Sequence, residues 1–304
     1  NYKLRIIMMK LIRYIMIVGL VLLYSSCRFS EDCNYTGNVQ LTMDWESLWG
    51  NIQKPESMSV LFYRSDKLSA QRTLLGDTIY ENIPSGETDM VIINRPSGTD
   101  LIGSESYNSL EISLPTYFEG NIRAISECPM ICSFSSHLTV PIEETVQQTV
   151  TPLPIIKQIF FVVHVVKEGI TGNVTACRAS LSGIPTAYSL SNQQALRNKA
   201  TVFFPLEKSE TEDETAGEKF QHDFYVLGVN PSIAGQESIP KKLTITVLLD
   251  DGEIKSDEVD LSAELDAFDQ NIFRCEVTVT ITAVSTNVEI SSWEQGIWLS
   301  LIHI

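Results

Sequence analysis

The feature that most restricts the fold of this chain is a two-residue alternation of apolar and polar side chains. Residues 39–46, Val-Gln-Leu-Thr-Met-Asp-Trp-Glu, alternate without a break. Successive side chains of a β-strand point to opposite faces of the sheet. This segment is therefore predicted to be a half-buried strand with Val39, Leu41, Met43 and Trp45 directed inward.

Further strands are predicted along most of the chain. They are expected at residues 58–63, 77–83, 88–94, 159–166, 174–181, 201–204, 220–229, 243–249, 254–261 and 277–283. Residues 84–86 are expected to form a hairpin turn or a corner between two sheets, and the apolar run 159–166 indicates a strand covered on both faces. No stretch has the period of a long amphipathic helix, and residues 262–271 are expected to hold only a short turn. Many short strands without βαβ alternation predict an all-β chain built of sandwiches.

Length and a proline-bearing segment indicate two domains. The chain has 304 residues, which suits two domains of ordinary size. Pro152 and Pro154 cannot donate backbone hydrogen bonds to a sheet, so their segment should be extended and lie at an edge. We predict an N-terminal β-sandwich over residues 38–148, a linker over 149–157 and a C-terminal β-sandwich over 158–298, each folding independently.

The N-terminus has the organisation of an export signal. Lys10 and Arg13 precede an apolar run that is far shorter than the roughly 20 residues of a transmembrane helix. Small residues and then Cys27 follow, and this order resembles a bacterial lipoprotein signal, which implies lipid attachment at Cys27. The alternative is cleavage without lipidation. We interpret residues 1–8 as upstream translation outside the protein, 9–26 as the signal peptide and 27–37 as a tether.

The charge of the chain limits the classes of partner. All 38 acidic residues follow Cys27, whereas only 18 of the 22 basic residues do. The part of the chain that is expected to be exported therefore carries a net charge of about −20 (18 minus 38). Nucleic acid and anionic membranes are recognised through basic surface, so neither is expected as a partner. Residues 299–304 resemble translated sequencing adaptor and are left out of the predicted fold, although their alternation also fits a final strand.

The cysteines and histidines offer little chemistry. Five cysteines follow Cys27, so at least one thiol is unpaired or paired between chains. Cys128 and Cys132 are predicted to form a disulfide or to remain two buried thiols. With His137 they supply only three nearby ligands, whereas a structural zinc site uses four, so no metal is predicted.

No catalytic motif is recognisable. The spacings H-E-x-x-H and G-x-S-x-G and the P-loop do not occur in the sequence. His164 lies within an apolar strand and is interpreted as a hydrogen-bonded sheet histidine. The acidic run 207–218 lacks the spacing of a calcium loop and is interpreted as a long solvated loop and a candidate binding surface. We predict that the protein is not an enzyme and uses no cofactor.

Short motifs, in their order along the chain, carry a resemblance to a known family. They are Asp44-Trp45 followed by the strand at 58–63, Ile-Pro-Ser-Gly at 83–86, Arg-Ala-Ser-Leu-Ser-Gly at 178–183 and Trp-Glu-Gln-Gly at 293–296. Together they resemble the fimbrillin-like surface lipoproteins of Bacteroides-type bacteria. The resemblance implies two tandem transthyretin-like or Ig-like β-sandwiches after a lipoprotein signal peptide. It also implies a lipid-anchored, surface-exposed position on the outer membrane.

The same resemblance bears on modification and assembly. Asp77-Thr78-Ile79 resembles the O-glycosylation triplet used by this bacterial group, which makes Thr78 a candidate O-glycosylation site. Fimbrillins polymerise by strand exchange after proteolysis removes the first strand. No dedicated cleavage site is apparent here, so we expect the protein to stay monomeric or to act as an anchor or terminal subunit.

The sequence and the resemblance together predict a non-catalytic, fimbrillin-related structural, adhesion or anchor subunit. Its expected partners are the outer membrane, through the N-terminal lipid, and fimbrial subunits or a host or glycan ligand. The alternative is a glycan-binding accessory lipoprotein, which would present clustered exposed aromatic side chains. Trp49, Tyr107 and Tyr117 are the loop candidates for such a cluster, and Trp45 reads as core.

Overall fold

A computed structural model describes residues 35–45, 54–196, 198–209, 217–229 and 237–296. The predicted signal peptide, Cys27 and the first part of the tether lie outside these ranges. So do Trp49, the centre of the acidic run and residues 299–304. Strands dominate the described residues, and none of the helices there has the length and apolar character needed to cross a membrane.

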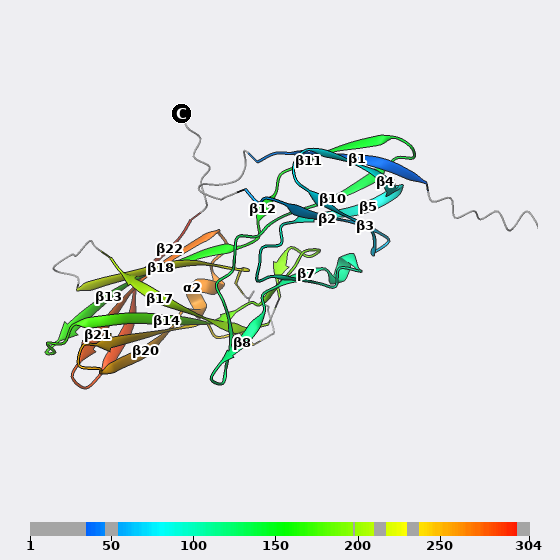
Figure 1. The fold of residues 1–304 in the computed structure, drawn as a ribbon. Helices are drawn as coiled ribbons and strands as arrows, with labels where there is room; N and C mark the ends of the chain where they lie inside the picture. Colours follow the sequence, from blue (N-terminus) through cyan, green and yellow to red (C-terminus); the bar gives the residue numbers. More distant parts are fainter. Residues whose placement is uncertain (1–34, 46–53, 197, 210–216, 230–236, 297–304) are drawn as a thin grey trace, which may run out of the picture.

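The first part of the chain folds into a sandwich of two sheets, shown at the upper right of Figure 1. One sheet has the order β11-β1-β4, and the other has the order β12-β10-β5-β2-β3. β1 pairs in parallel with β11 and antiparallel with β4. The strands are β1 (Thr36–Met43), β2 (Met58–Arg64), β3 (Lys67–Leu74), β4 (Thr78–Pro84), β5 (Gly86–Ile93), β10 (Cys132–Val140), β11 (Thr145–Val150) and β12 (Leu153–Pro154).

The second part forms one long sheet that folds over on itself. Its order is β20-β19-β14-β17-β18-β13-β21-β22, and the two ends, β20 and β22, approach each other. α2 (Ser262–Asp266) is the predicted short turn between β20 and β21. The strands are β13 (Lys157–Glu168), β14 (Val174–Ile184), β17 (Ala200–Lys208), β18 (Glu218–Val226), β19 (Lys242–Leu249), β20 (Ile254–Asp260), β21 (Ile272–Thr282) and β22 (Thr286–Gly296).

A middle segment of the first half joins the two sandwiches. The hairpin of β8 and β9 adds to the long sheet, because β9 pairs in parallel with β17. A small sheet of order β16-β15-β7-β6 combines strands from both halves. The elements are β6 (Asp100–Ile102), η1 (Tyr107–Ser109), β7 (Glu111–Ser113), β8 (Thr116–Glu119), β9 (Ile122–Ile125), β15 (Ala187–Ser189) and β16 (Gln194–Ala195).

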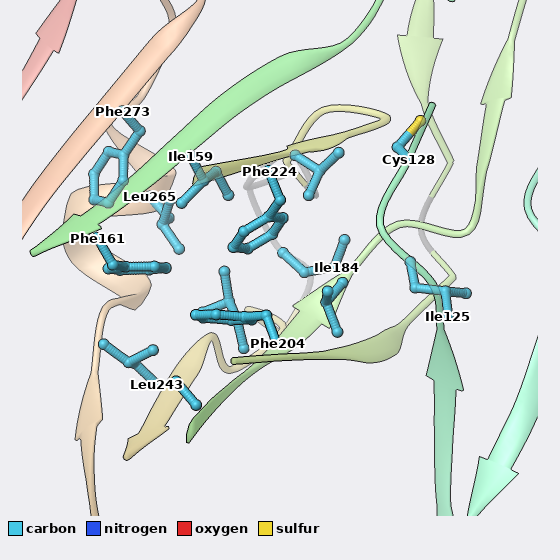
Figure 2. Close-up of a cluster of buried hydrophobic side chains, with 14 of the residues drawn as sticks. Ile125, Cys128, Ile159, Phe161, Ile184, Phe204, Phe224, Leu243, Leu265 and Phe273 are labelled. Atoms are coloured by element: carbon cyan, nitrogen blue, oxygen red, sulfur yellow. The ribbon is translucent and has the colours of Figure 1, made fainter. Parts of the chain in front are cut away.

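Two cores follow from this arrangement. The smaller lies inside the first sandwich and contains Val39, Leu41 and Phe62. The larger runs from the outer face of β2 and β5 through the small sheet into the second sandwich. Figure 2 shows its centre, where Phe161, Phe204 and other apolar side chains from β13, β17 and β18 fill the space between the sheet faces. β2 and β5 therefore contact apolar layers on both sides.

Most predicted strands are present with small shifts of their ends. Val39 and Leu41 are fully buried, and Met43 and Trp45 pack against the same core, as the alternation predicts. The chain passes from β4 in one sheet to β5 in the other, so residues 84–86 form the sheet-to-sheet corner and not a hairpin. The all-β prediction with sandwich packing is confirmed. The division into two independent domains stays a prediction.

Candidate functional site

A groove of about 670 Å³ lies where the two sandwiches meet. Its walls come from the start of β10, the segment that links the sandwiches and the turn between β15 and β16. The residues just after β18 and just before β21 complete them. Its lining consists of Ser133, Phe134, Ser135, Thr151, Leu153, Pro154, Ile155, Ile156, Lys157, Tyr188, Gln193, Gln194, Ala195, Leu227, Gly228, Val229 and Asn271. This volume is in the range of sites for small organic ligands.

One wall is the turn between β15 and β16. Ser189 Oγ accepts hydrogen bonds from the backbone nitrogen and the side-chain amide of Asn192, at 3.3 and 3.1 Å, and so fixes the turn. Gln193 adopts a positive φ of 52° at its end, a conformation that few non-glycine residues adopt. The amides of Gln193 and Gln194 consequently stand exposed at the rim of the groove.

The opposite wall is the start of β10. The side-chain oxygen of Asn94 accepts a hydrogen bond from the Cys132 backbone nitrogen at 2.6 Å, and its amide donates to the Met130 carbonyl at 2.9 Å. Asn94 is buried, so it holds the chain entering β10 in one position. Ser133 and Ser135 follow on the strand face opposite to Cys132, where they line the groove.

Lys157 supplies the one cationic group among the described residues of the lining. Its ammonium donates hydrogen bonds to the backbone carbonyls of Asp269 and Gln270 and lies 4.9 Å from the ring centroid of Phe268. Burial lowers the pKa of Lys157 below its usual value, although the nearby Asp269 carboxylate opposes this shift. The ammonium of Lys157 is therefore engaged by contacts within the protein.

The predicted modification residues lie elsewhere. Thr78 is the first residue of β4, an edge strand of the first sandwich, and it is half-buried. The carboxylate of the preceding Asp77 accepts a hydrogen bond from the Met43 backbone nitrogen at 2.8 Å, which ties the start of β4 to the end of β1. No interaction brings Thr78 to the groove. Cys27 lies outside the described residues.

Cys128 and Cys132 are both free thiols in the structure. Cys132 belongs to the core of the first sandwich, whereas Cys128 belongs to the larger core that reaches the second sandwich. Burial raises the pKa of Cys132 to about 12 and raises that of Cys128 further. This arrangement matches the alternative of two buried thiols, and the disulfide stays a prediction that thiol counting would test.

The histidines are placed differently from one another. His137 lies on β10 between two carboxylates of β5, with Nδ1 2.8 Å from Asp89 and Nε2 2.7 Å from Glu87. Among the described residues, no group of three or more His, Cys, Asp or Glu side chains is arranged to hold a metal ion. The expectation that His164 is fully hydrogen-bonded is wrong, because its buried Nδ1 has no partner among the described residues. Its strand neighbours Lys219 and Thr278 do not reach that atom.

The aromatic candidates within the described residues, which exclude Trp49, do not form one platform. Trp45 packs on the smaller core beneath the ammonium of Lys54, 5.0 Å from the ring centroid, and Tyr107 packs against Tyr63 at 5.6 Å. Tyr117 and its neighbour Phe118 are exposed on β8, but consecutive strand residues face opposite ways. The groove was not apparent in the sequence, because its walls come from segments far apart along the chain, and β15 and β16 have only two or three residues, which leave no periodic signal.

A family model matches residues 28–205 of the chain, more than half of its length. Its description is "Domain of unknown function (DUF5119)". The chain belongs to this family. The matched region of this DUF5119 member includes the first sandwich, the small sheet and the first strands of the second sandwich. No curated protein matches the sequence.

Solved structures share the fold of this DUF5119 protein. A candidate adhesin from Bacteroides ovatus has a TM-score of 0.59 at 15% identity, over 76% of this chain and 84% of that one. A candidate adhesin from Bacteroides thetaiotaomicron has a TM-score of 0.53 at 12% identity, over 87% and 98% of the two chains. The fimbrial anchor protein Mfa2 from Porphyromonas gingivalis has a TM-score of 0.50 at 12% identity, over 85% and 98%.

These similarities confirm the predicted resemblance to fimbrillin-like proteins at the level of the fold. Identities of 12–15% do not carry over a ligand or a partner. The function of this chain is therefore argued from its own residues.

Proposed function

We propose that this protein is a non-catalytic surface subunit that serves in adhesion or in anchoring fimbriae. The observation that carries the proposal is the fold, which is similar over 76–87% of this chain to the folds of two candidate adhesins and a fimbrial anchor protein. A rigid β scaffold with few helices suits a protein that transmits mechanical load and presents loops.

The proposal includes the position of the protein in the cell. A lipid on Cys27 would hold it in the outer membrane, and the tether would place the sandwiches outside. Two facts about the sequence support this: the short apolar run before Ser25-Ser26-Cys27 and the strongly acidic exported part. Thr78, at the half-buried start of an edge strand, would carry the O-linked glycan.

Labelling and surface protease digestion test the position. Cells that express the full-length protein are fed an alkyne fatty acid, and intact cells are then treated with protease. We expect label in the wild type and none in Cys27→Ala, together with digestion of the protein on intact cells. Equal label in both proteins, or full protection from protease, would contradict the proposed anchoring.

A deletion strain tests the role. Loss of the gene is expected to reduce attachment to a host-derived or glycan-coated surface, or to release fimbriae into the medium if the protein is an anchor. Complementation with the wild-type gene should restore the phenotype. A deletion strain with normal attachment and normally retained fimbriae would show that the proposed role is wrong.

A further inference from the structure

The groove between the sandwiches differs in charge from the rest of the molecule. The chain has 38 acidic residues among 304 and a net charge of −16, yet no carboxylate occurs among the described residues that line the groove. Lys157, the one cation of its lining, is engaged by two backbone carbonyls and an aromatic ring. The described lining therefore offers no available charge to an anionic or a cationic ligand.

The polar groups of the groove have unused hydrogen-bonding capacity. The hydroxyls of Ser133, Ser135 and Tyr188 and the amides of Gln193 and Gln194 make no side-chain hydrogen bond to any residue that the structure describes. A side-chain amide carries both donors and an acceptor, and a hydroxyl can act in either role. The groove thus presents neutral groups that can both give and accept hydrogen bonds.

Apolar side chains complete the surface. Leu153 is 45% exposed at one side of the groove, and the partly buried Ile155 and Val229 also line it. A matching ligand therefore needs neutral hydroxyl groups together with apolar carbon–hydrogen faces. Sugars have both features, because their rings carry hydroxyls around the edge and carbon–hydrogen bonds on the faces.

We propose that this groove binds a short, neutral oligosaccharide. The proposal deepens the adhesion function proposed above and rests on it, since it names the ligand class of the site. Ser135 belongs to the first sandwich, and Gln194 belongs to the second half of the chain. A sugar between them contacts both halves, so binding requires the two walls at the separation seen in the whole protein.

A peptide fits the groove less well. Peptides that bind β proteins commonly add a strand to an exposed sheet edge, which needs a run of unpaired backbone groups. The edge strands that border the groove, β12 and β16, are only two residues long. The available groups are side-chain amides and hydroxyls on opposite walls, which suit a ligand with hydroxyls on both sides.

Glycan-array screening and calorimetry on the full-length protein in detergent test the proposal. The array carries neutral and acidic oligosaccharides of defined structure, and calorimetry then measures the best neutral hit. The double variant Ser135→Ala, Gln194→Ala removes one hydrogen-bonding group from each wall. Gln71→Ala, an exposed glutamine on β3 away from the groove, is the matched control.

We expect at least one neutral oligosaccharide to bind, with affinity lowered about 10-fold or more in the double variant and unchanged in Gln71→Ala. Ser135→Trp, which places a large ring in the groove, should abolish binding while thermal melting shows a folded protein. The proposal is overturned if no neutral glycan binds, if only acidic glycans or peptides bind, or if the groove variants bind as the wild type does.

The two proposals fail separately. If the wild-type protein binds no neutral sugar, or the groove variants bind it as the wild type does, while the deletion strain loses attachment or releases fimbriae, the ligand assignment fails and the cellular role stands. If the purified protein binds the sugar through the groove while the deletion strain attaches normally and retains its fimbriae, the proposed cellular role fails and the ligand assignment stands.

Discussion

At the scale of single residues, His137 makes the first sandwich sensitive to pH. Hydrogen bonds to Asp89 and then Glu87 raise its pKa above 6.5, whereas hydrogen bonds from Thr139 and then His137 lower the pKa of Glu87 below 4.5. A raised histidine pKa gives stability below 6.5 that is lost as the pH rises through the folded value. A lowered carboxyl pKa gives stability above 4.5 that is lost as the pH falls through its folded value.

The cluster should therefore stabilise the protein most between about pH 4.5 and pH 6.5. We expect His137→Gln to lower the melting temperature more at about pH 5.5 than at about pH 9, where the wild-type imidazole is neutral. Thermal melts of both proteins at the two pH values measure this difference. A constant difference across pH would show that the cluster does not contribute through its charge.

Phe204 should contribute strongly to the stability of the second sandwich. Its ring stacks on Phe161 with centroids 5.7 Å apart and contacts Phe224 at 4.7 Å, and the residue is 3% exposed (Figure 2). Phe204→Ala should lower the free energy of unfolding by about 3–5 kcal/mol, measured by urea denaturation. Phe118→Ala, at a site 72% exposed, is the matched control and should change it by less than about 0.5 kcal/mol.

Lys241 and Asp266 form an asymmetric ion pair. The lysine side chain is 1% exposed and contacts the carboxylate of Asp266, which is 22% exposed at the end of α2. Asp266→Ala removes the carboxylate from a buried ammonium, which keeps the Ile239 carbonyl at 3.4 Å as an acceptor, and should cost about 3 kcal/mol in unfolding free energy. Lys241→Met leaves a carboxylate that water can reach, so its cost should be clearly smaller. An equal cost for both variants would contradict this account.

At the scale of elements, one close approach fixes the position of β1. The register of β1 against β4 shifts between Gly37 and Val39, and a Cβ atom on Gly37 would lie 1.9 Å from the Pro141 backbone carbonyl. Gly37→Ala must therefore displace β1 and should destabilise the protein by about 1–3 kcal/mol or more. A Cβ atom on Gly76 would meet nothing within 4 Å, so Gly76→Ala is the control. Urea denaturation of both variants measures the difference.

The sequence predicts many of the long elements because their signal is local, although β10 and β22, of 9 and 11 residues, were not among the predicted strands. The alternation of β1 and the apolar run of β13 each identify a strand without reference to its neighbours. Val162 is buried on the outer face of β13, and Phe160 lies under the guanidinium of Arg274. Phe160, His164 and Val166 on that face are half-buried, so the predicted cover on the second face is partial.

The small sheet and the groove are different, because pairing between distant residues forms them. β7 pairs with β15, and β15 pairs with β16, over two or three residues each. So short a segment has no detectable period, and nothing in residues 111–113 or 187–195 points to the partner strand. The groove residues could not be predicted for the same reason, since Gln193 and Gln194 appear in the sequence only as part of a polar turn.

At the scale of the whole molecule, the contacts between the halves modify the prediction of two independent domains. A fragment of residues 155–296 lacks β9, which pairs with β17, and β7, which pairs with β15. We expect fragments 34–148 and 155–296 each to show β-type circular dichroism and cooperative melting, with the second melting below the full chain. If neither fragment folds, the division near residues 149–157 is wrong.

The parallel pairings of β1 with β11 and of β13 with β21 set the order in which the chain can fold. Gln40 on β1 hydrogen-bonds Gln147 on β11, 107 residues later, and Lys157 on β13 reaches the carbonyl of Asp269, 112 residues later. Closing such long loops is entropically costly and slows folding. Neither sandwich can complete its sheet until almost its whole length has been synthesised. We therefore expect the nascent chain of each sandwich to stay unfolded, with its apolar strands open to chaperones, until synthesis of that sandwich is nearly complete.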